Sequence, residues 1–559
     1  MSAFDPITFR SLFPLLEEKI NDTEIVYFDN GATTQKPLCV IDKEQEYYRQ
    51  YNANVHRAAH QLSARATSAF EASRVKVQHF INAAFPHEII WTKGTTESIN
   101  LVAQSWGMNN LSVGDEIVLS HVEHHANIVP WQIVAKRTGA VIKLLPLDDV
   151  GRIDCKMLNE VINEKTKLVC CSHLSNVIGK INPIERIIRK AKSVGAKTLI
   201  DGAQAIAHIP VDVQQFDCDF YVFSAHKMYG PTGVGVLYGK MHLLQQMPVY
   251  QSGGEMIKQV SFSGTTFNDL PFKFEAGTPN IAGVVAFSSA IDFISEYQLN
   301  TNNHYKQQLL DYAFAQLSEL EALEFVVREK PDIPLFSFII NGHHQQDIST
   351  SLDVANIAVR VGHHCAMPLM EYLHISGCIR ISLAPYNSFN EIDYCIGTLK
   401  EILKDHNNEF SSNNSQETLD TFGSHKAVSP SEEMLLTFSQ AKSWDAKHRE
   451  IMLLGKTLNR MPKTLRSDET IISGCESAAW LSVSISSEGI FSFEADSNAK
   501  VIRGLLVIVL AAFNHKTSHD ILHFDIEDYF EQLGLIRHLS PSRGNGLLAI
   551  VKKIRNSVA

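Results

Sequence analysis

The sequence predicts an α/β fold, with a mostly parallel sheet covered by helices on both faces, followed by a smaller α+β domain. Over residues 1–405, short β-branched runs alternate with helical stretches, which is typical of strands joined by crossover helices. A segment rich in Asn, Ser, Thr and Gly interrupts this pattern at residues 406–430. The clearest predicted strands are residues 88–92, 115–120, 167–172, 197–202 and 219–224.

The interruption at residues 406–430 predicts a flexible linker between two folded units, because it has no sustained apolar period. After it, residues 431–559 are predicted to form two helices, a loop with Cys475, two strands and further helices. The longest apolar run, residues 504–513, is too short to cross a bilayer and predicts a buried helix.

Composition and charge exclude several classes of protein. The formal net charge of −11 argues against nucleic acid or an anionic membrane as the main partner. The nine cysteines, an odd number without a CxxC pair, fit neither a disulfide framework nor a zinc site. No basic segment precedes an apolar run near the N-terminus, so no signal peptide is predicted. We therefore expect reduced thiols and a cytoplasmic location.

Three polar segments near the ends of predicted strands indicate a cofactor site. Lys227 follows a strand in a glycine-rich turn, and Asp201 ends another strand. Thr95 and Thr96 begin a helical stretch, where backbone N–H groups and hydroxyls suit a phosphate. Each feature alone has an ordinary explanation, as a surface lysine or a helix cap. Together they match pyridoxal phosphate, which needs a lysine amine, a carboxylate for its ring nitrogen and a phosphate site.

A histidine-rich stretch, residues 120–131, adds His124, whose flat ring could stack on this cofactor. Metal binding is the alternative for neighbouring histidines, but no carboxylate or cysteine stands at ligand spacing nearby. A site made of His363, His364 and Cys365 would lack a convincing fourth ligand. No metal is therefore predicted.

An ordered series of motifs extends over nearly the whole of residues 1–405. The motifs are YFDNGATTQKP, NVHRAAHQLSARAT, TKGTTESINLVA, EHHANIVPWQ, HLSNVIGKINP, DGAQAIAHIPVDV, DCDFYVFSAHKMYGPTGVGVLY, FEAGTPN and VRVGHHCAMPLM. In this order they are similar to those of the type II cysteine desulfurases, the SufS/CsdA-like group of fold-type I pyridoxal phosphate enzymes. The resemblance implies this fold, pyridoxal 5′-phosphate as cofactor and a homodimer.

The resemblance also implies a role for each matching residue. Lys227 would carry the cofactor, Asp201 would pair with its ring nitrogen, and Gln204 would bond its phenolic oxygen. His124 would stack on the ring. The remaining implied roles are phosphate binding by Thr95, Thr96, Ser224 and His226, contact with the phosphate of the partner subunit by Thr278, and substrate carboxylate binding by Asn176 and Arg380.

Cys365 is the candidate nucleophile of the first domain. Most cysteines are small buried apolar residues, but the two histidines before Cys365 favour a polar, partly exposed setting in which a thiolate can form. The resemblance implies that Cys365 takes sulfur from free L-cysteine. Lys227 would remove the α-proton, the sulfur would form a persulfide on Cys365, and alanine would leave.

A second series of motifs lies in residues 431–559. It consists of WDAKHREIMLLGKTLNRMP, ISGCESAAWLSV, FEADSNAKVIRGLLVIVL and DYFEQLGLIRHLSPSRGNGL, and it resembles the SufE/CsdE family of sulfur-acceptor proteins. The resemblance implies that Cys475 accepts the persulfide sulfur; the alternative is a buried cysteine before a strand. Glu476 stands where many relatives have glutamine, and its carboxylate would raise the pKa of the thiol. Arg543 belongs to the last motif.

A flexible linker of about 25 residues would span roughly 25–30 Å. It would hold Cys475 near an active site at an effective concentration on the order of millimolar. The final acceptor expected from the resemblance is an iron–sulfur scaffold protein, with other sulfur modification as an alternative. Two other functions stay open: a selenocysteine lyase of the same fold, and a desulfurase whose C-terminal domain is only a docking module. The presence of both Cys365 and Cys475 favours a sulfur relay.

Overall fold

The computed structural model describes residues 4–20, 23–299, 304–412, 429–441, 444–467, 469–472, 478–535 and 541–558. Contacts within the chain divide it into two compact units. The first unit comprises Met1–Asn341 and Ala355–Lys400, and the second comprises Gly342–Val354 and Glu401–Ala559.

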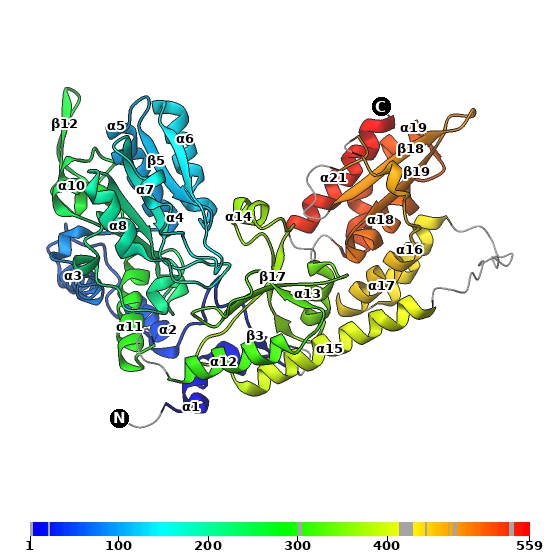
Figure 1. The fold of residues 1–559 in the computed structure, drawn as a ribbon, viewed down its shortest axis with the longest axis horizontal. Coiled ribbons are helices and arrows are strands. Elements are labelled where there is room, and N and C mark those ends of the chain that lie inside the picture. Colours follow the sequence, from blue (N-terminus) through cyan, green and yellow to red (C-terminus); the bar gives the residue numbers. More distant parts are fainter. Residues whose placement is uncertain are drawn as a thin grey trace. The chain divides into compact units, whose positions relative to one another are not determined.

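A seven-stranded sheet organises the first unit, with the strand order β4-β10-β9-β8-β7-β5-β6. Strand β5 of this sheet is labelled in Figure 1. Neighbours from β9 to β6 are parallel, whereas β10 is antiparallel to both β4 and β9. The mostly parallel sheet and all five strands predicted from sequence are confirmed. The strands are β4 (Ile89–Thr92), β5 (Glu116–Ser120), β6 (Val141–Leu145), β7 (Thr166–Ser172), β8 (Lys197–Asp201), β9 (Phe220–Ser224) and β10 (Gly235–Gly239).

Helices cover both faces of this sheet, because alternate residues of a strand enter different cores. In β7, Val169 and Cys171 belong to one hydrophobic core, and Leu168 and Cys170 belong to another. Such two-sided burial explains the continuous apolar runs of the strands. The first core includes α3 (Gln61–Phe80), α8 (Ile184–Ser193) and α11 (Ile281–Glu296), and the second includes α4 (Thr95–Val102), α6 (Val129–Thr138) and α10 (Met241–Gln246).

Polar side chains gather where the parallel strands end. Four strands finish on a polar residue, namely Ser120, Ser172, Asp201 and Ser224. The N-terminus of α4 lies at the same edge, since Gly94 before it meets Gly235 of β10. A Cβ at Gly235 would collide with the backbone of Gly94, so only glycine permits this approach. The carboxyl edge of the sheet is thus the polar edge, as in other open α/β sheets.

A smaller antiparallel sheet supplies the other wall of this region. Its strand order is β13-β14-β17-β16, and the short strands β15 and β3 form a separate parallel pair. Helix α14 (Met367–Tyr372) follows β16 after a short loop that contains Cys365. The strands are β13 (Leu323–Phe325), β14 (Leu335–Ile340), β16 (Arg360–Gly362), β17 (Cys378–Ser382), β3 (Val26–Tyr27) and β15 (Ile357–Ala358).

The second unit has the predicted α+β order. From residue 429 on, two described helices precede the antiparallel sheet β18-β19-β20, and further helices follow it. The unit also includes α13 (Gln345–Val354). The predicted buried helix is confirmed as α18, which belongs to the core of this unit. Within the described ranges, no helix combines the length and apolarity that crossing a bilayer requires. The elements are α16 (Pro430–Gln440), α17 (Trp444–Thr457), β18 (Ala479–Ile485), β19 (Ile490–Ser497), α18 (Lys500–Phe513), β20 (Lys516–Thr517), α19 (Ser518–His523), α20 (Ile526–Gln532) and α21 (Pro541–Val558).

The predicted linker between the two domains and the second candidate cysteine, Cys475, lie partly or wholly outside the described residues. Helix α15 (Phe389–Ser412) continues into the segment predicted as linker, whose residues 413–428 lie outside the described part. Cys475 and Glu476 also lie outside the described residues. The linker and the domain boundaries therefore stay predictions.

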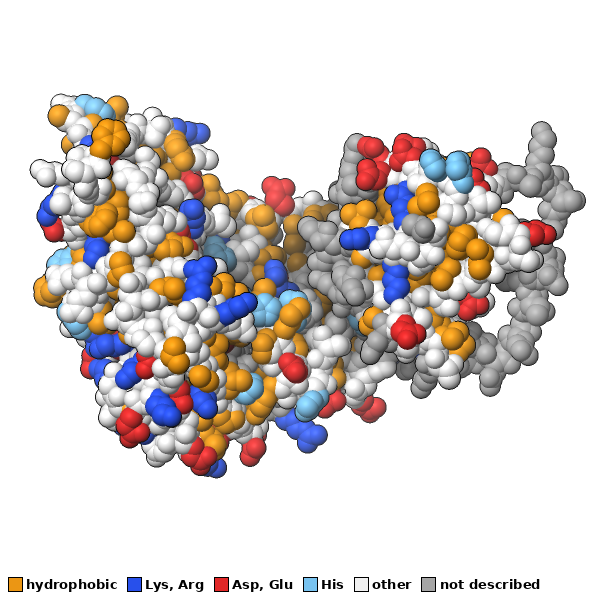
Figure 2. All heavy atoms as spheres, turned by 90° about the horizontal axis from the view of Figure 1, so that it is seen from above, with side chains coloured by type: hydrophobic (Ala, Val, Ile, Leu, Met, Phe, Trp, Pro, Cys, Tyr) orange, Lys and Arg blue, Asp and Glu red, His pale blue; other side chains and the backbone are white. Residues whose placement is uncertain are grey.

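Buried ion pairs distinguish the interior from the surface. On the face drawn in Figure 2, acidic, basic and hydrophobic side chains are interspersed among the described residues. Exposed pairs such as Lys258–Asp269 contribute little to stability. Inside the first unit, Arg74 of α3 instead makes a two-pronged pair with Glu275, at 2.7 and 2.9 Å. Removal of Arg74 would leave the buried Glu275 carboxylate without its cation, whereas removal of Glu275 would leave Arg74 with Glu71, at 2.9 Å, as its remaining carboxylate.

Two glycines bring α17 and α18 into backbone contact. A Cβ at Gly504 would collide with the carbonyl oxygen of Ile451, and a Cβ at Gly455 would collide with that of Lys500. Glycine therefore sets the separation of these helices.

We expect Gly504→Ala to destabilise the second unit by about 1–3 kcal/mol, because the added methyl meets rigid backbone. Hydrogen exchange of the α18 amides in the full chain measures the effect. Gly544→Ala in α21 is the matched control, since a Cβ there meets nothing within 4 Å. Equal exchange in the two variants would contradict the close packing of α17 and α18.

Candidate active site

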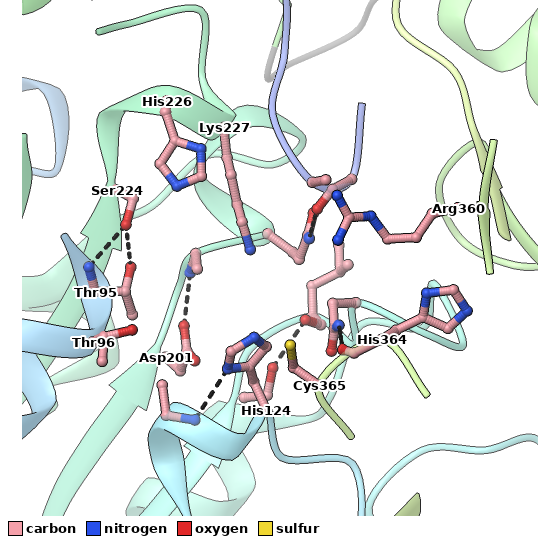
Figure 3. Close-up of a pocket in the computed structure, with 18 of the residues that line it drawn as sticks. Thr95, Thr96, His124, Asp201, Ser224, His226, Lys227, Arg360, His364 and Cys365 are labelled. Atoms are coloured by element: carbon pink, nitrogen blue, oxygen red, sulfur yellow. Dashed lines mark hydrogen bonds between the residues drawn. The ribbon is translucent and has the colours of Figure 1, made fainter. Parts of the chain in front are cut away.

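A cavity of about 280 Å³ lies between the carboxyl edge of the large sheet and the small sheet. Figure 3 shows Lys227, His124 and Cys365 approaching it from three different segments. The residues of the sequence prediction that line it are Thr95, Thr96, His124, Asn176, Asp201, Gln204, Ser224, His226, Lys227, Cys365 and Arg380. Residues that are far apart in sequence thus meet at one site.

Lys227 and Asp201 form the charged centre of the cavity. Lys227 ends the short 3₁₀ turn after β9, and Asp201 is the last residue of β8. Burial lowers the pKa of Lys227 to about 8, although the Asp201 carboxylate opposes this shift. Burial raises the pKa of Asp201, against a hydrogen bond from the backbone N–H of Ala203 at 2.9 Å. A large fraction of Lys227 is therefore a neutral amine near pH 8.

The start of α4 is arranged as an anion site. No side chain caps this helix at Gly94. The Thr95 N–H donates to Ser224 Oγ at 2.8 Å, and the two hydroxyls share a hydrogen bond of 2.7 Å. Thr96 and His226 complete this side of the cavity. A helix N-terminus with two threonines and a serine beside it fits a phosphate.

His124 is a neutral ring at the cavity wall. Its Nδ1 accepts a hydrogen bond from the backbone N–H of Ala126 at 3.0 Å, so that nitrogen carries no proton. Burial lowers the pKa of His124 to about 4, and the nearby Lys227 adds to the effect. An uncharged aromatic ring in this position suits stacking on a flat cofactor.

Two arginines face each other across the small sheet, in spite of their like charges. Arg360 of β16 pairs in register with Arg380 of β17. The Asp29 carboxylate accepts from Arg360 Nη2 at 3.0 Å and from Arg380 Nη2 at 3.2 Å. Burial opposes the charge of Arg360, but Asp29 raises its pKa overall, whereas burial lowers the pKa of Arg380. One surplus positive charge is left for an anionic ligand.

Arg360 and Asp29 were missed by reasoning from sequence. Both belong to motifs quoted above, YFDNGATTQKP and VRVGHHCAMPLM. Their roles depend on the pairing of β16 with β17 and on the position of the segment after β3, neither of which is readable from the motifs.

Asn176 links Arg380 to the loop that carries Cys365. Its backbone oxygen accepts from Arg380 Nη1 at 2.9 Å, and its side-chain Nδ2 donates to the carbonyl of His364 at 2.9 Å. Gln204 likewise donates through Nε2, to the carbonyl of Gly31 at 2.6 Å. The predicted contacts of both side chains with substrate or cofactor stay predictions.

Thr278 does not line this cavity. It borders a second one, together with Trp91, Lys93 and Glu97. A position away from the site of its own chain agrees with the expected contact with a partner subunit, which stays a prediction.

The cavity fits pyridoxal phosphate. It offers an amine, a buried carboxylate, a flat neutral ring and an anion site at a helix N-terminus, which are the groups this cofactor requires. Arg380 Nε and His364 Nδ1 are buried at its wall, and neither has a hydrogen-bond partner among the described residues. A bound anion would accept the hydrogen bond that Arg380 Nε can donate. Among the residues that the structure describes, no three His, Cys, Asp or Glu side chains are grouped to hold a metal ion.

Fold and cavity together define an α/β enzyme that binds pyridoxal phosphate. Residues 26–395 match the aminotransferase class-V family, and residues 432–558 match the SufE family, described as the Fe-S metabolism associated domain. The chain belongs to the cysteine desulfurases of the aminotransferase class-V family and carries a C-terminal SufE domain. Its cofactor is pyridoxal 5′-phosphate, so the predicted family and cofactor are confirmed.

Relatives and solved structures agree over the first domain. A cysteine desulfurase of Yersinia pestis is 47% identical over 397 residues, which are 71% of this chain and 97% of the relative. A probable cysteine desulfurase of Vibrio cholerae is 46% identical over 394 residues, 70% of this chain and 97% of the relative. The crystal structure of the cysteine desulfurase CsdA of Escherichia coli has a TM-score of 0.67 and 40% identity, covering 72% of this chain and 99% of that one.

We expect covalent attachment of the cofactor to Lys227 to accelerate with pH around a midpoint near 8, because only the neutral amine reacts. Rapid-mixing absorbance of cofactor-free protein with pyridoxal phosphate measures the midpoint. Asp201→Asn should move it to lower pH, since the carboxylate raises the pKa of Lys227. A midpoint near 10.5, the ordinary lysine value, would refute the effect of burial.

Proposed function

We propose that this protein converts L-cysteine to L-alanine, forms a persulfide on Cys365 and relays the sulfur to Cys475, to supply iron–sulfur cluster assembly or related sulfur transfer. The observation that carries the proposal is that Lys227, Arg380 and Cys365 line one cavity in a chain that also has a SufE domain. We infer a cytoplasmic location, supported by the eight described cysteines, all of which are free thiols.

The chain would bind its substrate through charge. Arg380 holds the substrate carboxylate with its unpartnered Nε, and Asp29 fixes the guanidinium from the other side. Arg360 adds positive charge at the same wall. Placement of the carboxylate at Arg380 orients the substrate Cα toward Lys227 and its sulfur toward Cys365.

Pyridoxal phosphate, when bound, stabilises negative charge at the substrate Cα and so makes the C–S bond cleavable. Lys227, with a pKa of about 8, takes the proton from Cα as a neutral amine. The Cys365 thiolate attacks the substrate sulfur: an S–S bond forms, the C–S bond breaks, and its electron pair stays on Cβ. Protonation of Cβ and Cα completes alanine, and the sulfur remains on Cys365 as a persulfide.

The second domain would receive the sulfur. Attack of the Cys475 thiolate on the terminal sulfur of the persulfide transfers that sulfur and regenerates Cys365. Covalent connection of the two domains favours this step by raising the local concentration of the acceptor. A homodimer, in which Thr278 reaches the site of the partner subunit, and an iron–sulfur scaffold protein as the next acceptor complete the proposal.

Two alternatives differ in measurable ways. A selenocysteine lyase would release selenium without needing Cys365, whereas a desulfurase depends on it. A C-terminal domain that served only for docking would leave Cys475 unmodified.

Single turnover with sulfur-labelled L-cysteine, followed by mass mapping of persulfide peptides, tests the relay. We expect label on Cys365 and Cys475. Cys365→Ala should remove both labels while the cofactor spectrum persists, and Cys475→Ser should leave label on Cys365 alone. Cys39→Ala, at the exposed start of α2 (Leu38–Gln50), is the control and should change neither label. Full turnover by Cys365→Ala would sink the proposal, and label on Cys365 alone in the unmodified chain would exclude the relay.

A further inference from the structure

The loop that carries Cys365 has an unusual backbone. Within four residues, three have a positive φ: Gly362 at 104°, His364 at 50° and Cys365 at 56°. Residues other than glycine adopt this left-handed region infrequently, because Cβ crowds the backbone. Such a conformation persists only where surrounding contacts hold it.

Two imidazole nitrogens hold the loop on either side of the cysteine. The Cys365 N–H donates to Nδ1 of His363 at 3.1 Å. The Met367 N–H, at the start of α14, donates to Nε2 of His125 at 2.9 Å. His125 adds a third bond through its main chain: its backbone N–H donates to the carbonyl oxygen of Cys365 at 2.7 Å. Both histidines thus clamp the main chain at and next to Cys365.

The protonation of these rings follows from the bonds. A backbone N–H only donates, so the imidazole nitrogen opposite it must be unprotonated. His125 is therefore neutral with its proton on Nδ1, and His363 is neutral with its proton on Nε2. Protonation of either ring would set an N–H against a backbone N–H, so both clamps exist only while the rings are uncharged.

The surroundings disfavour a charge on His125. The ring centroids of His125 and His363 are 5.5 Å apart, so a charge on one disfavours a charge on the other. The ring centroids of His124 and His125 are 6.3 Å apart. Arg360 and Arg380 face the neighbouring His364 from β16 and β17. Burial and His363 both lower the pKa of His125.

We propose that His125 and His363 are positioning residues that hold Cys365 in line with the substrate sulfur as a pair of neutral hydrogen-bond acceptors, and that protonation of either ring releases the loop. Neither residue lines the cavity, so neither touches the reacting atoms. The inference rests on the proposed role of Cys365 as sulfur acceptor. It adds that acid slows persulfide formation through the loop, in addition to the loss of the neutral Lys227 amine below about pH 8.

The chain offers variants that keep each acceptor but do not titrate. In His125→Gln the amide oxygen replaces Nε2, and in His363→Asn the amide oxygen replaces Nδ1 and accepts from the N–H two residues on, as in an Asx turn. His125→Leu and His363→Ala remove the acceptors. His121→Gln is the matched control, because His121 stacks on Tyr372 of α14 but lends no acceptor to the loop.

Single-turnover persulfide formation by the holoenzyme, from about pH 8 to about pH 5, tests the clamps. At the upper pH we expect His125→Leu and His363→Ala to be slower than the unmodified chain by about tenfold to 100-fold. His125→Gln, His363→Asn and His121→Gln should stay close to it. Towards low pH, the combined His125→Gln and His363→Asn variant should lose less rate than the unmodified chain or the His121 control.

Two further measurements distinguish a positioning role of the histidines from a general loss of structure in the variants. Cofactor content and the rate of Cys365 alkylation by iodoacetamide should not fall in His125→Leu, because thiol and cofactor site are retained. Relative to the intrinsic exchange rate at each pH, the protection of the α14 amides should fall on acidification of the unmodified chain but not of the combined His125→Gln and His363→Asn variant, whether or not Cys365 accepts sulfur. Normal persulfide rates in both acceptor-free variants, or an unchanged acid profile in the combined variant, would overturn the proposal. Turnover by Cys365→Ala would instead overturn the proposed function.

Discussion

Burial of the large sheet on both faces is the constraint on which the rest of the structure depends. With helices packed on each side, the strand interiors are apolar and polar groups are confined to the strand ends. Because β5, β7, β8 and β9 are parallel, their carboxyl ends share one edge. Asp201, Ser224 and Lys227 are therefore neighbours in space as a result of the fold, although no local sequence rule brings them together.

A second constraint is electrostatic. Arg360 and Arg380 stand opposite each other on adjacent strands, an arrangement that costs free energy unless a carboxylate lies between them. Asp29 supplies that carboxylate, and the wall keeps one net positive charge. On the other side of the cavity, burial holds His124 neutral and lowers the pKa of Lys227. The site thus combines a cationic wall with an amine that can give up its proton.

Much of this could be predicted from the sequence. Continuous apolar runs identified the strands, and the resemblance placed eleven residues that do line the cavity. Arg360, Asp29 and His125 were not predicted, because their partners are set by strand register and loop conformation rather than by local pattern. Helix α15 runs to Ser412, inside the segment predicted as linker, and the linker itself stays a prediction because residues 413–428 lie outside the described part. Thr278 and Cys475 depend on a second chain and on residues outside the described part.

The contact between α17 and α18 limits how the second unit can vary. Ordinary helix interfaces accept a larger residue on one side when a smaller one appears opposite. Here Gly455 and Gly504 each face a carbonyl oxygen of the other helix, and a main-chain atom cannot be exchanged for a smaller one. No compensating substitution is available, so a designer who wished to repack this domain would have to treat both positions as fixed.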